Sequence, residues 1–323
     1  MAELKNTPLR EFHLEMGAKM VPRAGWNLPL NFSEGAADEE ECCRTKAALF
    51  DFCADGRYRV AFPGALQTFE KLLFQGGGER KTGSCRRELL ADDRGTAVAF
   101  CRVSLMAEDD IFITVPFQSR ERVERFFSQK SLEYNDLSEY LCCIGISGPE
   151  SINVLTQCGV SEDALPGKGE TKILELDGLR AIVSFSQDLD DTGFEINCNA
   201  ECADQIWDLF LETDLPWPAG LAAQESLRLE REVHGAAELQ LPRSAADVKS
   251  KLGCVVFSGK RVPFAGVKLY DPAGNEVGVV TSSAVSAALG AALAFAFFPG
   301  GIPEKERELH ADASGVEIKG FCR

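Results

Sequence analysis

The 323-residue chain has the composition of a folded globular protein, with 45% hydrophobic and 26% charged residues. Its length exceeds what a single hydrophobic core usually serves, so we expect two or three subdomains. Thirty-four basic and fifty acidic residues give a net charge of -16, which repels phosphate backbones and anionic membranes and so disfavours nucleic acid and membranes as partners.

The first predicted α+β unit follows a short N-terminal region. Residues 57–62, 96–105 and 111–115 are rich in β-branched and aromatic side chains and are predicted strands. Apolar residues repeat at helical spacing between residues 66 and 73. A second helix is predicted after Ser119, whose hydroxyl suits an N-cap.

A second α+β unit follows in the chain. Its predicted strands fall at residues 140–146, 172–176, 179–185 and 194–197. Ser147 and Glu150 have the spacing of a capping box before a predicted helix. Another helix is predicted from about residue 200, and Gly220 opens one that runs through Leu229.

The pattern changes after His234. Short β segments punctuated by glycine and proline are typical of a compact β module, so we predict a domain boundary near residues 235–245. The apolar stretch at residues 284–298 is shorter than the about twenty residues that cross a bilayer and indicates buried core.

Targeting signals and cysteines bear on location and on metals. No basic segment followed by an apolar run opens the chain, which favours a cytoplasmic protein. The twelve cysteines form no C-x-x-C pair, so we predict reduced thiols and no metal site.

Separated segments of the chain together resemble the folate-dependent aminomethyltransferases, the T-protein of glycine cleavage. These segments are residues 7–13 (TPLREFH), 16–30 (MGAKMVPRAGWNLPL), 193–195 (GFE), 220–230 (GLAAQESLRLE) and 278–283 (GVVTSS). The resemblance implies an α+β fold in three domains around a central folate-binding opening. One α+β lobe would combine residues 1–50 and 140–235, a second would span 51–139, and 236–323 would form a β-barrel-like domain.

The resemblance also implies residues that bind tetrahydrofolate. Glu195 matches the family glutamate that holds the pterin ring through paired hydrogen bonds, and Arg228 matches an arginine that faces the folate. The residues alone leave alternatives open: Glu195 as a strand-edge acid without a ligand, and Arg228 in an intrahelical ion pair with Glu225 or Glu232. Trp26 could line the pocket or belong to a satellite core.

The catalytic residue implied by the family has no counterpart in this chain. Family members pass an aminomethyl carbon from a lipoyl thiol to N5 of tetrahydrofolate, with help from an aspartate in an Asp-Asp pair. The pair falls near Ala99-Phe100, where no carboxylate stands. Asp92 and Asp93 lie upstream in an Asp-Asp-Arg-Gly segment that is ordinary turn chemistry. Catalytic residues therefore stay unassigned.

Other pocket positions also depart from the family pattern. Arg86 falls where an aromatic residue is usual, Pro116 where an asparagine is usual, and residues 75–78 (QGGG) where relatives often show Asn-Asp.

A sister branch, the YgfZ-type proteins, binds folate without aminomethyl transfer and supports iron–sulfur cluster assembly or repair. Its Lys-Gly-Cys-Tyr-x-Gly-Gln-Glu signature is partly matched by residues 251–261 (KLGCVVFSGKR), which makes Cys254 a candidate functional thiol.

Three functions follow from these patterns. The leading hypothesis is a tetrahydrofolate-binding protein nearer this branch, with an iron–sulfur protein as partner. The first alternative is a true aminomethyltransferase that works with a lipoyl carrier protein and uses a substitute acid such as Asp92. The second is a degenerate scaffold that has lost folate.

Overall fold

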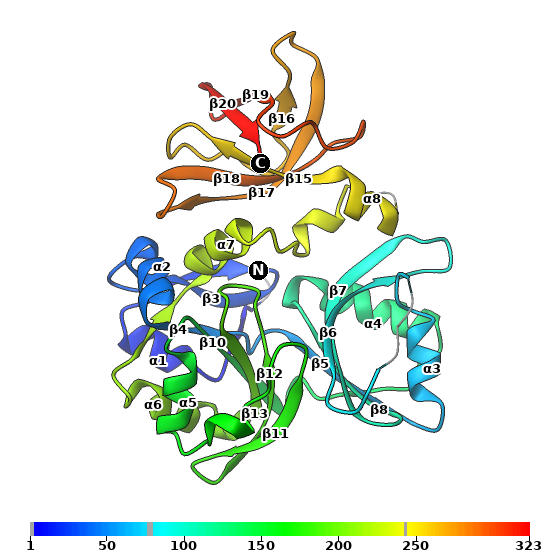
Figure 1. Ribbon diagram of the computed structural model, residues 1–323, viewed down its shortest axis with the longest axis vertical. Coiled ribbons are helices and arrows are strands. Elements are labelled where there is room, and N and C mark those ends of the chain that lie inside the picture. Colours follow the sequence, from blue (N-terminus) through cyan, green and yellow to red (C-terminus); the bar gives the residue numbers. More distant parts are fainter. Residues whose placement is uncertain (1–2, 76–79, 242–243) are drawn as a thin grey trace.

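The computed structural model describes residues 3–75, 80–241 and 244–323. Figure 1 shows two α+β lobes side by side with a β-barrel above them. The first lobe takes its elements from residues 5–51 and 141–230, the second from 56–136, and the barrel from 252–322. The α+β class expected from the sequence is confirmed. In the described part of the chain, no helix is long and apolar enough to cross a membrane.

The first lobe is built on a six-stranded sheet of order β11-β12-β13-β10-β4-β14. Its strands are β4 (Ala47–Asp51), β10 (Leu141–Ser147), β11 (Thr171–Leu176), β12 (Leu179–Phe185), β13 (Gly193–Asn199) and β14 (Pro216–Ala219). A small sheet of β1 (Lys5–Asn6), β2 (Lys19–Arg23) and β3 (Trp26–Asn31) belongs to the same lobe.

Strand β4 is buried on both faces of this sheet. Successive side chains of a strand point to opposite faces, and accordingly Ala47 and Leu49 join one hydrophobic cluster while Ala48 and Phe50 join another. The first cluster is covered by α1 (Arg10–Glu15), α5 (Ser151–Gln157) and α6 (Ala203–Leu211), and the second by α2 (Ala36–Thr45) and α7 (Leu221–Glu230). The second cluster lies on the side of the barrel, so α7 is sandwiched between sheet and barrel (Figure 1).

The second lobe is built on a five-stranded sheet of order β6-β7-β8-β5-β9. Its elements are β5 (Gly56–Ala61), α3 (Ala65–Glu70), β6 (Cys85–Ala91), β7 (Ala97–Ala107), β8 (Asp110–Val115), α4 (Arg120–Gln129) and β9 (Asn135–Asp136). In β7, Ala99, Cys101 and Val103 enter the core of the lobe, which leaves Phe100 and Arg102 on the opposite face, toward the centre of the molecule.

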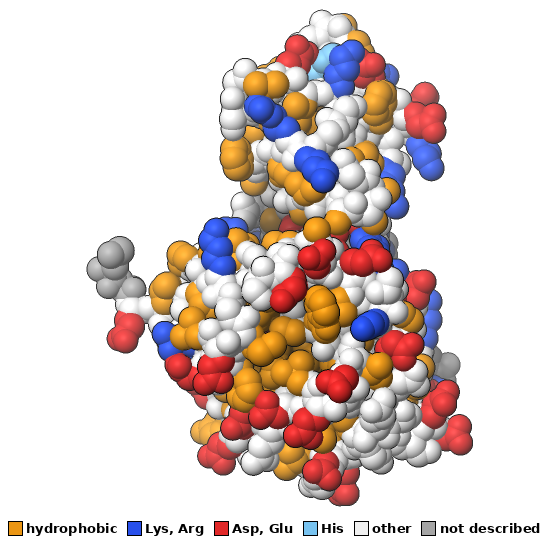
Figure 2. Space-filling model, turned by 90° about the vertical axis from the view of Figure 1, so that its left-hand side faces the viewer, with side chains coloured by type: hydrophobic (Ala, Val, Ile, Leu, Met, Phe, Trp, Pro, Cys, Tyr) orange, Lys and Arg blue, Asp and Glu red, His pale blue; other side chains and the backbone are white. Residues whose placement is uncertain are grey.

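The barrel closes through six strands in the order β15-β18-β17-β16-β19-β20. They are β15 (Leu252–Phe257), β16 (Lys268–Tyr270), β17 (Glu276–Ser286), β18 (Ala291–Phe297), β19 (Glu308–Asp312) and β20 (Glu317–Cys322). The apolar stretch at 284–298 therefore consists of the end of β17, a turn and the buried strand β18. Figure 2 shows a constriction between barrel and lobes, and acidic side chains spread over the lobes.

Three local expectations are corrected by the structure. Helix α8 (Ala245–Lys251) was missed after His234; it is short and begins at Ser244, whose hydroxyl accepts the N–H of Asp247. Ser119 precedes α4 but its side chain makes no capping hydrogen bond. The capping box at Ser147 does not form, because Ser147 is the last residue of β10. Single helical turns complete the fold at Phe117–Ser119, Glu162–Ala164, Ala200–Cys202 and Ala237–Leu239.

Candidate functional site

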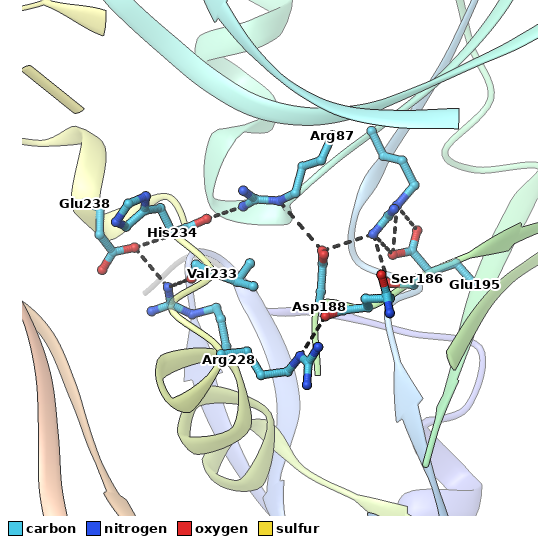
Figure 3. Close-up of polar contacts among 12 residues, drawn as sticks. Arg87, Ser186, Asp188, Glu195, Arg228, Val233, His234 and Glu238 are labelled. Carbon is cyan, nitrogen blue, oxygen red and sulfur yellow. Dashed lines mark hydrogen bonds and ion pairs between the residues drawn. The ribbon is translucent and has the colours of Figure 1, made fainter. Parts of the chain in front are cut away.

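A cavity of about 1190 Å³ lies where the two lobes and the barrel meet. Its wall includes strands β7 and β13, helix α7, the segment after α7, and β17 of the barrel. Several of its charged side chains come from different elements and are paired with one another, as Figure 3 shows. The cavity is of the size that small organic ligands occupy.

Glu195 lies on β13 and faces this cavity across from Arg102 of β7. Arg102 Nη2 lies 2.8 Å from Glu195 Oε1, and Arg102 Nε donates to both carboxylate oxygens at 3.1 Å. Arg102 Nη2 also reaches Asp188 Oδ2 at 3.0 Å and the Ser186 hydroxyl at 2.9 Å. Burial alone would lower the pKa of Arg102, but the two carboxylates outweigh it and raise that pKa.

Phe100 occupies the cavity face of β7 next to Arg102. The guanidinium carbon of Arg87 lies 4.4 Å from the centre of the Phe100 ring, and the His234 ring stacks on the Phe100 ring with 6.2 Å between centres. Arg87 also donates to the carbonyl of His234 and lies 3.7 Å from Asp188. The segment that should hold the family aspartate therefore presents an aromatic ring and a guanidinium to the cavity.

Arg228 lies on α7 in the cavity wall, where four groups hold it; one is the carbonyl of Val233, to which Nη1 donates at 2.5 Å. It pairs with Glu225 at 2.6 Å and with Glu238 at 3.0 Å, and it donates to the Ser282 hydroxyl at 3.1 Å. Of the two intrahelical partners considered from the sequence, Glu225 is observed, whereas Glu232 Oε1 lies 3.6 Å from Arg323 Nε. The carboxylates raise the pKa of Arg228 against the opposing effect of burial.

Glu238 was missed by the sequence analysis although it is fully buried beneath the barrel. It accepts hydrogen bonds from Gly235 N–H, the Ser282 hydroxyl and Arg228. Segments 220–230 and 278–283, which both carry the family resemblance, therefore meet through this carboxylate. Burial opposes its ionisation, but Arg228 and these hydrogen bonds lower the pKa of Glu238.

Trp26 and Cys254 lie outside the described cavity wall. Trp26 is half-buried, with Lys5 Nζ 5.5 Å from the centre of its ring. Cys254 lies in β15 at 3% exposure, and burial raises the pKa of its thiol to about 12. A reactive thiol needs exposure and a depressed pKa, so this environment does not favour reactivity.

The remaining sequence candidates are placed as follows. Asp92 sits in the turn between β6 and β7, where Oδ1 accepts the N–H groups of Arg94 and Thr96, and it is not in the described cavity wall. Pro116 does line the cavity, whereas Arg86 lies in β6 and is absent from the described wall. Residues 76–78 lie outside the described residues. Among the described residues, no group of three His, Cys, Asp or Glu side chains could hold a metal ion.

His234 gives the cavity a pH-dependent contribution to stability. Burial lowers the pKa of His234 to about 4, opposed by Glu238 and reinforced by Arg87 and Arg228. Below about pH 6.5 the His234 side chain binds a proton in the unfolded chain but not in the folded one. The contribution of His234 to the free energy of unfolding is therefore fully present above that pH and is lost as the pH falls toward 4.

Between pH 7 and pH 5, the free energy of unfolding is therefore expected to fall by about 2 kcal/mol more in wild type than in His234→Gln. Urea unfolding at both pH values would measure the difference, with His310→Gln, on the far strand β19, as the matched control. Parallel pH dependence of wild type and His234→Gln would contradict the assignment.

The protein is thus a three-part molecule, in which two α+β lobes and a barrel surround a charged central cavity. Residues 9–251 match the family described as the GCVT N-terminal domain. Because the match covers most of the chain, the protein belongs to the folate-binding aminomethyltransferase superfamily.

Relatives with assigned names agree with this membership. The chain is 26% identical to the aminomethyltransferase of Geobacillus kaustophilus and 25% identical to that of Saccharopolyspora erythraea, covering 98% of this chain and 96% of the relative in both cases. The crystal structure of the glycine cleavage system aminomethyltransferase T from Bartonella henselae has a TM-score of 0.86 at 21% identity, covering 99% of this chain and 97% of that one. That likeness shows the fold.

Proposed function

We propose that this chain binds a reduced folate in the central cavity and transfers an aminomethyl-derived carbon to it. The observation that carries the proposal is Glu195, a carboxylate that faces a cavity of about 1190 Å³. By sequence resemblance, Glu195 matches the family glutamate that holds the pterin ring. A carboxylate has about four lone-pair sites, so its bonds to Arg102 leave positions for two ligand N–H groups.

Aminomethyl transfer is favoured over the iron–sulfur branch for two reasons. The relatives that match along nearly the whole chain are named aminomethyltransferases. The thiol that would link the chain to the other branch, Cys254, is buried and has a raised pKa. A lipoyl carrier protein is the partner that this reaction requires, and cytoplasmic location remains the prediction from the sequence.

The proposal assigns the arginines of the cavity a share in binding. Arg102 orients Glu195, and Arg228 is fixed by Glu225 and Glu238 in the opposite part of the wall. Charged side chains whose conformations are held by partners lose little entropy when a ligand binds, so the site is pre-organised.

Glu195→Gln is expected to weaken binding of a stable reduced folate at least tenfold, because an amide offers one acceptor and adds a donor toward the ligand's N–H groups. Titration calorimetry at pH 7.5 would measure the dissociation constants of wild type and variant. Glu121→Gln, at an exposed position of the same cavity wall, is the matched control and should bind as wild type.

Equal affinity of wild type and Glu195→Gln would remove Glu195 from the site. No binding by the wild type would instead favour the degenerate scaffold, the other candidate that the departures at Ala99, Phe100 and Pro116 support.

A further inference from the structure

Five of the seven acidic residues in the described wall of the central cavity are matched to specific partners. Asp51 accepts from His13 and Thr7, and Glu40 accepts the N–H of Ala287. Asp188 and Glu195 share Arg102. Glu225 is likewise paired, with Arg228.

Two acids of this wall, Glu121 and Asp55, form no ion pair with any described residue. Glu121 is exposed to solvent, whereas Asp55 is partly buried. Asp55 is therefore the one desolvated carboxyl of the described wall whose charge is not neutralised by direct contact.

The turn that carries Asp55 joins β4 of the first lobe to β5 of the second and is held rigidly. Fully buried Arg57 donates to the carbonyls of Phe52, Cys53 and Asp55 at 2.7, 3.2 and 2.8 Å. Arg57 Nε also donates to the Asn197 side chain at 3.2 Å. A carboxyl on so constrained a turn has a defined position, as acid–base chemistry requires.

The carboxyl of Asp55 uses one oxygen for structure and leaves the other available. Oδ1 accepts the N–H of Phe117 at 2.9 Å, and Oδ2 receives no hydrogen bond from the described residues. Because Asp55 is part of the cavity wall, a ligand in the cavity can meet this carboxyl without breaking any ion pair.

The surroundings of Asp55 favour the protonated, neutral form of its carboxyl. Burial is the largest effect and raises the pKa of Asp55 to about 7, against the lowering effects of Arg57 and the Phe117 N–H. Glu195 on β13 and Asp51 on β4 add repulsion that also raises it. Arg120 of α4, whose guanidinium donates to the neighbouring carbonyl of Ala54 at 3.4 Å, is a further charge near this turn. A carboxyl with this pKa exchanges protons readily at neutral pH.

We propose that Asp55 is the catalytic acid–base residue of the central site, in place of the carboxylate that β7 lacks. This inference rests on the proposed function. The carboxylate of Asp55 accepts the proton that a folate nitrogen loses as that nitrogen bonds to the transferred carbon. In the same step the carbon–sulfur bond of the aminomethyl donor breaks, and its electron pair stays with the sulfur.

Asp55→Asn tests the assignment because it keeps the size of the side chain and its acceptor for the Phe117 N–H, but cannot take up a proton. We expect reduced-folate affinity within about threefold of wild type and a turnover at least about a hundredfold lower. Wild-type turnover should rise with pH through about 7, where Asp55 loses its proton, and the residual turnover of the variant should lack this rise. Asp92→Asn, at a turn outside the described cavity wall, should match wild type.

A second readout does not depend on turnover. Ligand binding excludes water from the carboxyl and raises its pKa further, so wild type should take up part of a proton on binding at pH 7. Calorimetry in two buffers of different ionisation enthalpy would detect this uptake, and Asp55→Asn should reduce it.

The outcomes separate the two proposals. If wild type fails to bind reduced folate, the proposed function fails and the role of Asp55 with it. If folate binds but wild type transfers no carbon, the transfer part of the proposed function fails together with the role of Asp55. If wild type does transfer carbon and Asp55→Asn matches it in turnover, pH profile and proton uptake, the role of Asp55 alone is overturned.

Discussion

Arg102→Leu is expected to lower the free energy of unfolding by about 3–5 kcal/mol. Arg102 lies between the two lobes at 11% side-chain exposure and neutralises Glu195 and Asp188 together. Removing it leaves Glu195 without a counter-ion in a largely buried position, and Asp188 keeps only the more distant Arg87. An uncompensated buried charge costs far more than the pair itself contributes to stability.

Urea unfolding at pH 7 would measure this loss. The control is Arg59→Leu, which removes an ion pair with Asp110 at a side chain that is 51% exposed and should cost at most about 1 kcal/mol. The loss in Arg102→Leu should shrink as the pH falls, because protonation discharges the abandoned carboxylates. A loss under about 1 kcal/mol at pH 7, or one independent of pH, would contradict this account of the cavity.

Arg57→Met is expected to destabilise the protein by a similar amount, about 3–5 kcal/mol, through a different mechanism. Arg57 makes no ion pair in the described structure; its guanidinium instead satisfies three backbone carbonyls of its own turn and Asn197. Methionine fills much of the same volume but leaves those acceptors without donors, at about 1–3 kcal/mol for each buried group.

Thermal and urea unfolding would measure the effect, with exposed Arg125→Met as the control, since Arg125 makes one hydrogen bond, to the Glu121 carbonyl. Arg57→Lys should fall between wild type and Arg57→Met, because a single ammonium cannot reproduce the planar fork of donors. If Arg57→Met unfolds with the wild-type midpoint, the turn is not held by this guanidinium.

The sequence predicted those parts of the fold whose signal is local. Strands such as 111–115 and 179–185 and the helix from Gly220 to Leu229 were recognised because their apolar residues repeat at the period of the element. The capping roles of Ser119 and Ser147 were wrong, since hydroxyl spacing fixes which groups could bond but not where a strand ends. The overall three-part arrangement came from family resemblance rather than from periodicity.

The wall of the cavity could be predicted only in part. Glu195 and Arg228 were found by resemblance, but their partners Arg102 and Glu238 were not. Arg102 is 93 positions from Glu195 in the chain, so only the folded topology brings them together. The sequence did contain one signal. An arginine in the middle of the largely apolar strand β7 needs a counter-ion if both faces of that strand are covered.

Asp55 was missed for a related reason. Asp55 stands directly before Gly56 in the turn between β4 and β5, and a carboxylate in such an Asp-Gly pair is usually a solvated turn residue. What distinguishes Asp55 is its partial burial and the lack of a cation in direct contact, and both depend on how the two lobes are joined.

The nesting of the second lobe inside the first has a consequence for synthesis on the ribosome. Strand β4 pairs with β10 and β14, both of which follow the entire second lobe in the chain. At typical elongation rates β4 leaves the ribosome about 5–18 s before β10 does. During that interval a nascent strand buried on both faces in the native state has neither neighbour, whereas the second lobe can already fold. The segment around residues 47–51 is therefore the part of the nascent chain that stays unpaired while the second lobe folds.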